Sequence, residues 1–263
     1  MIIVISLLLI FTGCTGNEIN DSYSWTENKF IAHAAGDIDG VVYTNSLEAF
    51  RKSYEEGYRL FEIDISITSD GELVARHGWE ENYGQDNFVT NKPLSYEKFM
   101  SLPYYDKYTA MDFKMIIKLL EEFKDIYLIL DGKVTSVEDT KVIYKEVGEA
   151  TRDMAKSDFN RLIPQLFYED NLSVIRQYGF HDLIYVIGRE EYTNSSIIQF
   201  CEDNDIRVVS LSRKRANERF IQKLAVKDIN VYIYTLNDVD EMKSYKEIGV
   251  HGYFTDLVKP DTF

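Results

Sequence analysis

Short apolar runs alternate with longer amphipathic segments along most of this chain. Runs of about five apolar residues are typical of buried strands, and apolar residues recurring every three or four positions are typical of helices. The pattern predicts strands at residues 30–33, 59–65, 126–131, 162–165, 183–187, 207–211, 231–235 and 252–255. It predicts helices at residues 46–56, 112–123, 137–154, 172–178, 195–202, 218–226 and 238–248.

The alternation extends over about 230 residues without a Pro-, Gly- or Ser-rich linker, which favours one closed domain over two. We therefore expect an α/β fold, a (β/α)8 TIM barrel over residues 29–263. A doubly wound open sheet is the alternative, because the order of strands is not visible in a sequence.

One predicted connection is unusually long. About sixty residues separate the second and third strands, far more than a βα connection needs. The connection opens with Asp70-Gly71, a hairpin signal, and several aromatic residues follow, namely Trp79, Tyr83, Tyr104, Tyr105 and Tyr108. Because βα loops carry the active sites of barrels, we expect this long insertion to form a lid or wall for a substrate. The alternative is a surface insertion without a ligand.

The first eleven residues are apolar except Ser6. A run of this length is too short to span a membrane, which takes roughly 17 to 25 residues, but it fits a signal peptide. Small residues directly before Cys14 resemble a bacterial lipobox. The sequence therefore predicts a lipoprotein-type signal peptide at 1–13, a lipid anchor on Cys14, a linker at 14–28, and an exported protein anchored to the membrane at the bacterial cell surface. No basic residue precedes the apolar run, so other export and a buried N-terminal segment are alternatives.

Charge and cysteine content narrow the range of partners. The chain has 44 acidic and 29 basic residues and a net charge of −15, so its field repels polyanions and nucleic acid is not expected as a partner. The two cysteines, Cys14 and Cys201, lie far apart in the sequence and suggest no disulfide framework. Cys201 is expected to be a buried core thiol.

The second predicted strand carries acidic residues in strict alternation with apolar ones. Glu62, Asp64 and Ser66 therefore share one face of the strand. If that face points into the barrel, the two buried carboxylates repel each other and require a cation or a proton. Oxygen ligands suit Ca²⁺ or Mg²⁺. An exposed edge strand would give the same alternation.

The third predicted strand ends with Asp131-Gly132-Lys133, which places a carboxylate and an ammonium on one face. Asp131 is a candidate third metal ligand, and Lys133 a candidate phosphate-binding residue. A local ion pair on the rim of the barrel is the alternative.

Two of the four histidines follow predicted strands. His33 ends the first strand and His77 ends the hairpin, so a barrel would place both on the face that carries the carboxylates. Two imidazoles can act as general base and general acid near neutral pH. His181 and His251 would lie at the opposite face and are expected to be structural.

An ordered set of motifs resembles the glycerophosphodiester phosphodiesterase family, within the phosphatidylinositol phospholipase C-like phosphodiesterase superfamily. The matching residues are Ala32-His33, 45–50, Glu62-Ile63-Asp64, 68–71, His77, Asp131-Gly132-Lys133, 234–237 and 252–256. The resemblance implies a β/α barrel that hydrolyses glycerophosphodiesters to glycerol phosphate and an alcohol with a divalent cation, Ca²⁺ or Mg²⁺. The acid/base pair would be His33 and His77.

The resemblance also implies roles for residues around that pair. Glu62, Asp64 and Asp131 would bind the metal, and Asn45 and Lys133 would assist at the metal and the phosphate.

The sequence departs from the family pattern at several positions. The Arg that usually follows the first histidine is Ala34, and the Asp after the second histidine is Gly78. The third ligand is the shorter Asp131 rather than Glu, and the usual late Trp is Tyr234. Losing a guanidinium that binds phosphate costs about 1.5 to 3 kcal/mol unless another cation replaces it.

We expect Lys133 or Arg76 to provide the replacement for that guanidinium. Two other functions stay open: a phospholipase C or D that acts on membrane lipid, and a catalytically inactive surface-binding lipoprotein.

Overall fold

A computed structural model describes residues 23–80, 92–134, 136–188 and 192–263. The predicted signal peptide at 1–13, the Cys14 anchor and Tyr83 lie outside the described residues. None of the described helices is long and apolar enough to span a membrane.

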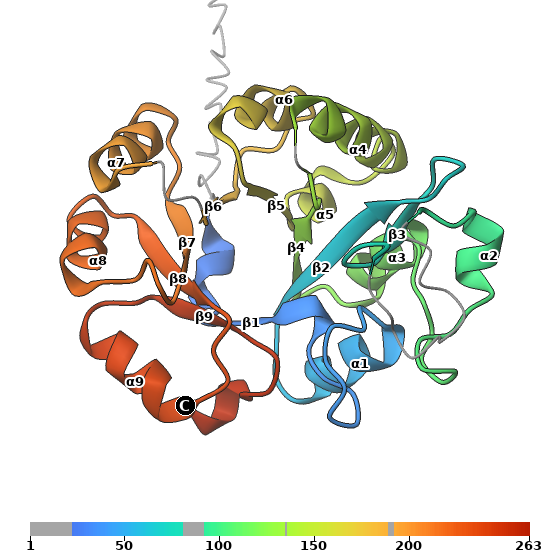
Figure 1. The fold of residues 1–263 in the computed structure, drawn as a ribbon, viewed down its shortest axis with the longest axis horizontal. Coiled ribbons are helices and arrows are strands. Elements are labelled where there is room, and N and C mark those ends of the chain that lie inside the picture. Colours follow the sequence, from blue (N-terminus) through green and yellow to red (C-terminus); the bar gives the residue numbers. More distant parts are fainter. Residues whose placement is uncertain (1–22, 81–91, 135, 189–191) are drawn as a thin grey trace, which may run out of the picture.

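Eight parallel strands close into a barrel (Figure 1). They are β1 (Phe30–Ala32), β2 (Leu60–Ile67), β4 (Tyr127–Asp131), β5 (Leu162–Leu166), β6 (Ile184–Ile187), β7 (Val208–Ser212), β8 (Asn230–Tyr234) and β9 (Gly252–Thr255). The ring closes at β1, where Ile31 lies opposite Leu60 of β2 on one side and Phe254 of β9 on the other. The predicted TIM barrel is therefore confirmed, and the open sheet is excluded.

Helices surround the barrel on its outside (Figure 1). The longer ones are α1 (Leu47–Glu55), α3 (Phe113–Glu122), α4 (Val137–Ala150), α6 (Leu172–Gln177), α7 (Asn194–Asp203), α8 (Glu218–Ala225) and α9 (Val239–Glu247). Most of them begin after a residue whose side chain accepts a backbone N–H of the first turn, as Ser46 does for α1 and Asp112 for α3. Such caps fix where each helix starts. The helix predicted at 137–154 ends earlier, at Ala150, and the short α5 (Lys156–Phe159) follows it.

The inward face of the strands builds an apolar layer near the amino-terminal end of the barrel, its base. This layer consists of Ile31, Leu60, Ile129, Ile163, Ile184, Val208, Tyr232 and Phe254. The alternate residues point outward, and Phe61, Ile63 and Ile65 of β2 pack in the main core of the protein. In β2, alternate residues therefore face the barrel interior and the main core outside the barrel, as the alternation in the sequence predicts.

The 3-10 helix η1 (Ser24–Glu27) closes the base of the barrel. Trp25 is buried against the inward apolar layer, its ring stacks on Tyr232 at 6.2 Å, and its Nε1 donates to Asp182 Oδ2 at 3.2 Å. The sequence predicts a linker over 14–28, but residues 23–28 of that range belong to the fold. The physical reason is the large apolar surface that Trp25 and Tyr23 bury.

The connection between β2 and β4 contains β3 (Leu73–Ala75), α2 (Tyr96–Met100) and α3. β3 pairs antiparallel with β2, and Ile67 lies opposite Leu73. The hairpin predicted at Asp70-Gly71 therefore forms, with a five-residue rather than a two-residue loop. Beyond it lies a separate apolar group, here called the aromatic cluster, made of Val74, Phe99, Tyr104, Tyr108 and Ala110. A role of this connection as a substrate lid stays a prediction.

Candidate active site

Three carboxylates meet inside the barrel, two of them within β2 and one at the carboxyl-terminal end of β4. Glu62 and Asp64 face inward from β2, and Asp131 ends β4 in register with Asp64. All three are buried, and one oxygen from each lies within 4.8 Å of the others. The structure thus brings together the three residues that the sequence predicts as metal ligands.

Burial and mutual repulsion set the protonation of this group. Burial and the neighbouring Asp64 raise the pKa of Glu62 well above its usual value. Burial alone would also raise the pKa of Asp64, but the Lys133 ammonium holds it below its usual value. Lys133 Nζ lies 2.7 Å from Asp64 Oδ1 and also pairs with Asp131 Oδ2. One ammonium therefore compensates only part of the negative charge.

The remaining atoms of the group suit a hard divalent cation. Glu62 Oε2 accepts the Ala34 N–H at 2.6 Å, whereas Glu62 Oε1 is buried and has no hydrogen-bond partner within the described part of the chain. A buried carboxylate oxygen without a partner is costly unless a ligand contacts it. A set of oxygen donors alone fits Ca²⁺ or Mg²⁺. Glu62, Asp64 and Asp131 are thus the residues that would hold the ion.

Asn45 reaches the same site from the loop between β1 and α1. Its Nδ2 donates to Asp64 Oδ2 at 2.7 Å, and its Oδ1 accepts the Asp64 N–H at 3.0 Å. Asn45 has a φ of 49°, a left-handed conformation that costs free energy for a residue other than glycine. The loop accepts this cost and orients the Asp64 carboxylate with two hydrogen bonds.

His33 begins the short turn η2 (His33–Ala35) directly after β1. Its Nδ1 lies 2.8 Å from Asp256 Oδ1, and Asn237 Nδ2 donates to Asp256 Oδ2 at 2.7 Å. Burial lowers the pKa of His33, but the hydrogen bond to Asp256 and the charges of Glu62, Asp256 and Asp64 outweigh burial and raise it to about 9. In the metal-free protein these carboxylates therefore favour the protonated imidazole.

Sequence reasoning gave no role to Asp256 and Asn237. A signal was present, because Asp256 directly follows β9 at the same end of the barrel where Asp131 ends β4. An acidic residue at that end is a candidate for the active site of any barrel.

His77 follows β3, and one aromatic side chain contacts both His77 and His33. The Tyr43 ring makes edge contacts with both imidazoles, at 4.9 Å from His33 and 6.2 Å from His77 between ring centroids. The two predicted acid/base residues therefore flank a common neighbour, which sequence reasoning did not identify. Nothing local in the sequence signals Tyr43, because the contact depends on the path of the whole β1–α1 loop.

Arg76 and Lys133, the predicted replacements for the missing guanidinium, both lie at this end of the barrel. Lys133 contacts the two carboxylates described above. Arg76 lies opposite Asp64, whose carbonyl accepts the Arg76 N–H at 2.9 Å. The Arg76 side chain is buried, and its guanidinium carbon lies 5.1 Å from the centroid of the Trp79 ring. Lys133 is thus the cation that contacts the carboxylates, whereas the Arg76 guanidinium packs on Trp79.

The other two histidines lie away from the site. His251 Nε2 is 2.8 Å from Lys29 Nζ and 2.8 Å from the Thr26 carbonyl, at the base of the barrel. His181 contacts Arg176 through its carbonyl, which accepts from Nη1 at 2.6 Å. These contacts agree with the structural roles expected for both histidines.

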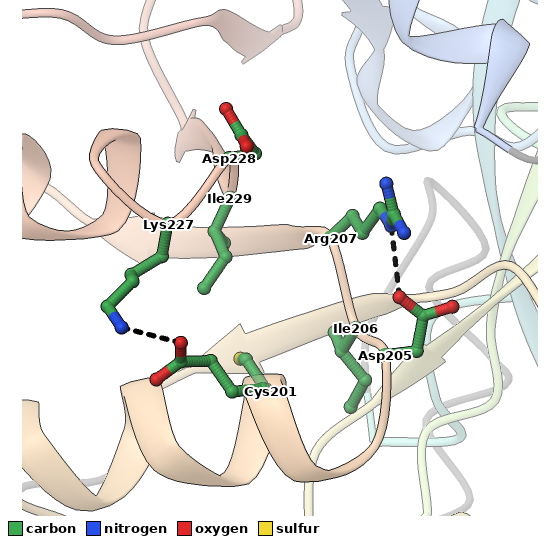
Figure 2. Close-up of a pocket in the computed structure, with 8 residues that line it drawn as sticks. Cys201, Asp205, Ile206, Arg207, Lys227, Asp228 and Ile229 are labelled. Atoms are coloured by element: carbon green, nitrogen blue, oxygen red, sulfur yellow. Dashed lines mark hydrogen bonds and ion pairs between the residues drawn. The ribbon is translucent and has the colours of Figure 1, made fainter.

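An open pocket of about 270 Å³ lies at the base between α7 and β8 (Figure 2). Four of its charged groups form two ion pairs, Lys227 with Glu202 at 2.6 Å and Arg207 with Asp205 at 3.0 Å. Cys201 is buried at its edge, and burial raises the pKa of the thiol to about 12. The core position predicted for Cys201 is therefore confirmed. The pocket lies away from Glu62, Asp64 and Asp131.

Several known proteins are similar to this chain in sequence or in structure. The human protein named lysophospholipase D GDPD1 is 22% identical over 87% of this chain and 83% of its own length. A phosphodiesterase from Oleispira antarctica, solved with the product sn-glycerol-3-phosphate, superposes with a TM-score of 0.70 at 16% identity, over 87% of this chain and 92% of the other. A glycerophosphodiester phosphodiesterase from Thermotoga maritima superposes with a TM-score of 0.67 at 19% identity, over 89% and 97%.

A family model provides the assignment. The model of the glycerophosphoryl diester phosphodiesterase family matches residues 34–260, which include all of the candidate site except His33. The family consists of enzymes that hydrolyse phosphoric diesters. This chain therefore belongs to the glycerophosphoryl diester phosphodiesterase family.

Proposed function

We propose that the protein is a metal-dependent phosphodiesterase that hydrolyses glycerophosphodiesters to glycerol phosphate and an alcohol. The observation that carries the proposal is the group of three buried carboxylates within 4.8 Å of one another, beside a histidine that Asp256 orients. The Oleispira antarctica structure, which contains sn-glycerol-3-phosphate, supports the glycerol phosphate product.

The metal would be held by Glu62, Asp64 and Asp131. When bound, a divalent cation neutralises charge on the phosphate oxygens as a Lewis acid. Asn45 keeps the Asp64 carboxylate in place for this role through its two hydrogen bonds. The all-oxygen donor set favours Ca²⁺ or Mg²⁺ over softer ions.

The two histidines divide the proton transfers. The hydrogen bond and the charge of Asp256 favour the protonated form of His33, so His33 donates a proton from Nε2 to the oxygen of the leaving alcohol. His77 accepts the proton of the attacking hydroxyl, which belongs to water or to the glycerol of the substrate. Asp256 stabilises the charged imidazole before the transfer and fixes its orientation.

Arg76 and Lys133 would bind the phosphate in place of the missing guanidinium. Lys133 already lies beside two of the proposed metal ligands. The buried Arg76 side chain packs on Trp79, and a guanidinium can form two parallel hydrogen bonds with a phosphate. Export and anchoring through Cys14 are part of the proposal and rest on the sequence pattern alone.

The decisive experiment measures the release of glycerol phosphate from a panel of soluble glycerophosphodiesters. The purified protein is tested with Ca²⁺, with Mg²⁺ and with a chelator, beside the His33→Gln variant. We expect release that depends on the ion and is abolished in the variant. Release that the chelator leaves unchanged would contradict the metal dependence, and no release with any ion would contradict the proposed substrate class.

A lysophospholipid is a second candidate substrate. The human relative is named a lysophospholipase D, and here Trp79 and Tyr43 pack on the aromatic cluster next to the histidines. Aromatic surface of this kind can contact an acyl chain or a choline headgroup. Comparing turnover of a micellar lysophospholipid with that of the soluble diester of the same headgroup distinguishes the two substrates.

A further inference from the structure

We propose that Tyr43 is a positioning residue that holds both acid/base imidazoles in their working orientation. Its ring lies almost perpendicular to each of them, at 83° to His33 and 78° to His77. Edge-to-face contacts of aromatic rings are favourable and directional, so one ring in contact with two imidazoles fixes their mutual arrangement. The inference deepens the proposed function and rests on it, since the two histidines take their roles from it.

The backbone around Tyr43 is built to hold this ring in place. Tyr43 has a φ of 63°, which is uncommon for a large side chain. Two residues later, Asn45 is tied to Asp64 by two hydrogen bonds, and its N–H donates to the Ala34 carbonyl at 3.1 Å. Strained positions that persist in active sites are those that their surroundings hold firmly. The loop that orients a metal ligand thus also places Tyr43.

Tyr43 also packs on the aromatic cluster of the β2–β4 connection. His33 lies on β1 and its turn, whereas His77 follows β3 in that connection. Tyr43 therefore joins two segments that approach each other only in the folded barrel. Asp256 holds His33 through the hydrogen bond to Nδ1. Because the Tyr43 ring contacts both imidazoles, it positions His77 relative to His33.

The contacts that carry this proposed role are made by the ring of Tyr43. Proton transfer requires the imidazole nitrogen within hydrogen-bonding distance of the substrate oxygen, and a displacement of about 1 Å can cost about 100-fold in rate. We therefore expect Tyr43→Phe to preserve the positioning and Tyr43→Ala to lose it.

Proton NMR tests the geometry without any substrate. The chain has four histidines and hence four imidazole Cε1–H signals, which single His→Gln variants assign. In the full-length protein, Tyr43→Ala should shift the signals of His33 and His77 and leave those of His181 and His251 in place, while Tyr43→Phe should leave all four near their positions. A shift of only one signal of the pair, or of neither, would overturn the proposal.

Kinetics tests the consequence for catalysis. We expect Tyr43→Ala to lower kcat by about 10- to 100-fold with KM changed less than about threefold, and Tyr43→Phe to stay within about threefold of wild type. Tyr96→Ala is the matched control, because Tyr96 packs on the same aromatic cluster and its described ring contacts include neither histidine. Thermal unfolding shows whether each variant is folded.

The outcomes separate this inference from the proposed function. Equal loss in Tyr43→Phe and Tyr43→Ala, or equal loss in Tyr96→Ala, would overturn the positioning role. A wild-type protein that hydrolyses no phosphodiester would refute the proposed function, and the NMR result would still decide whether Tyr43 orients both imidazoles.

Discussion

The two ends of the barrel interior differ although the same strands build both. In four strands an apolar residue at the base is followed, two positions later, by a polar residue that lies in the strand or directly after it. The pairs are Ile31 and His33, Leu60 and Glu62, Ile129 and Asp131, and Phe254 and Asp256. A spacing of two residues therefore separates the apolar layer that stabilises the barrel from the polar layer that forms the candidate active site.

Burying side chains has opposite effects on the free energy of folding in the two layers. Each apolar residue of the base gains free energy by leaving water, whereas each buried carboxylate at the other end loses its hydration and repels its neighbours. Changes at the base should therefore reduce stability and spare the chemistry. Changes two residues later should do the reverse.

The Glu62→Gln variant tests this contrast with the largest expected effect. We expect kcat/KM to fall by about 1000-fold, because a direct ligand matters more than the supporting partners whose loss costs 10- to 100-fold. Without metal, the variant should be at least as stable as wild type, because a neutral amide replaces a carboxyl group whose charged form is disfavoured by burial and by Asp64. Kinetics and denaturant unfolding with a chelator measure both. Glu55→Gln, on the exposed face of α1, is the control, and a loss of less than tenfold in Glu62→Gln would contradict the assignment.

The Leu60→Ala variant changes the same strand one layer lower. We expect the free energy of unfolding to fall by roughly 2 to 5 kcal/mol, because the side chain is fully buried in the base layer. Metal affinity and kcat of the folded protein should stay near wild type. Urea unfolding and metal titration check the two halves of this statement, with Val226→Ala at an exposed site as the control. A large loss of metal affinity would show that the layers are not independent.

Stability should depend on pH through His33. Its pKa in the folded protein is raised to about 9 from 6.5, so its stabilising contribution is complete below about pH 6.5 and is lost as the pH rises through 9. The metal-free protein should therefore lose on the order of 2 kcal/mol between these values. Asp256→Asn should show a smaller loss, because the hydrogen bond that raises the pKa is weakened. Unfolding at both pH values in the presence of a chelator gives the comparison, and identical losses would contradict it.

The smallest effect concerns the replacement for the missing guanidinium. We expect Arg76→Ala to lower kcat/KM by about tenfold, which corresponds to the loss of one charged hydrogen-bonding group. Lys114→Ala, an exposed cation near Glu72, should have no effect. If Arg76→Ala and Lys133→Ala each left turnover unaltered, neither residue would substitute for the family arginine, whose position is occupied here by Ala34.

The sequence predicted the barrel because its signals are local. Each strand is a short apolar run, and the alternation in 61–67 states which residues face inward. Strand closure followed from the number of units, and the pairing of β1 with both β2 and β9 confirmed it. The boundaries of helices such as α4 differed because caps and tertiary packing decide where a helix ends.

Long-range contacts set the limit of that prediction. The group of Glu62, Asp64 and Asp131 was predictable, because the end of a strand already defines a position in a barrel. The bond from His33 to Asp256 joins residues 223 positions apart, and no local pattern pairs them. The position of Tyr43 depends on a loop in which Tyr43 and Asn45 have left-handed backbone conformations. The pattern of apolar and polar residues does not predict the path of such a loop.

The helix η1 has a consequence for how the enzyme meets its surroundings. Tyr23 enters at the base, opposite His33 and His77, and its N–H is fixed to Asp182 at 2.5 Å. If Cys14 carried a lipid, residues 15–22 could extend over at most about 29 Å, and this tether would keep the base of the barrel nearer to the membrane than the catalytic end.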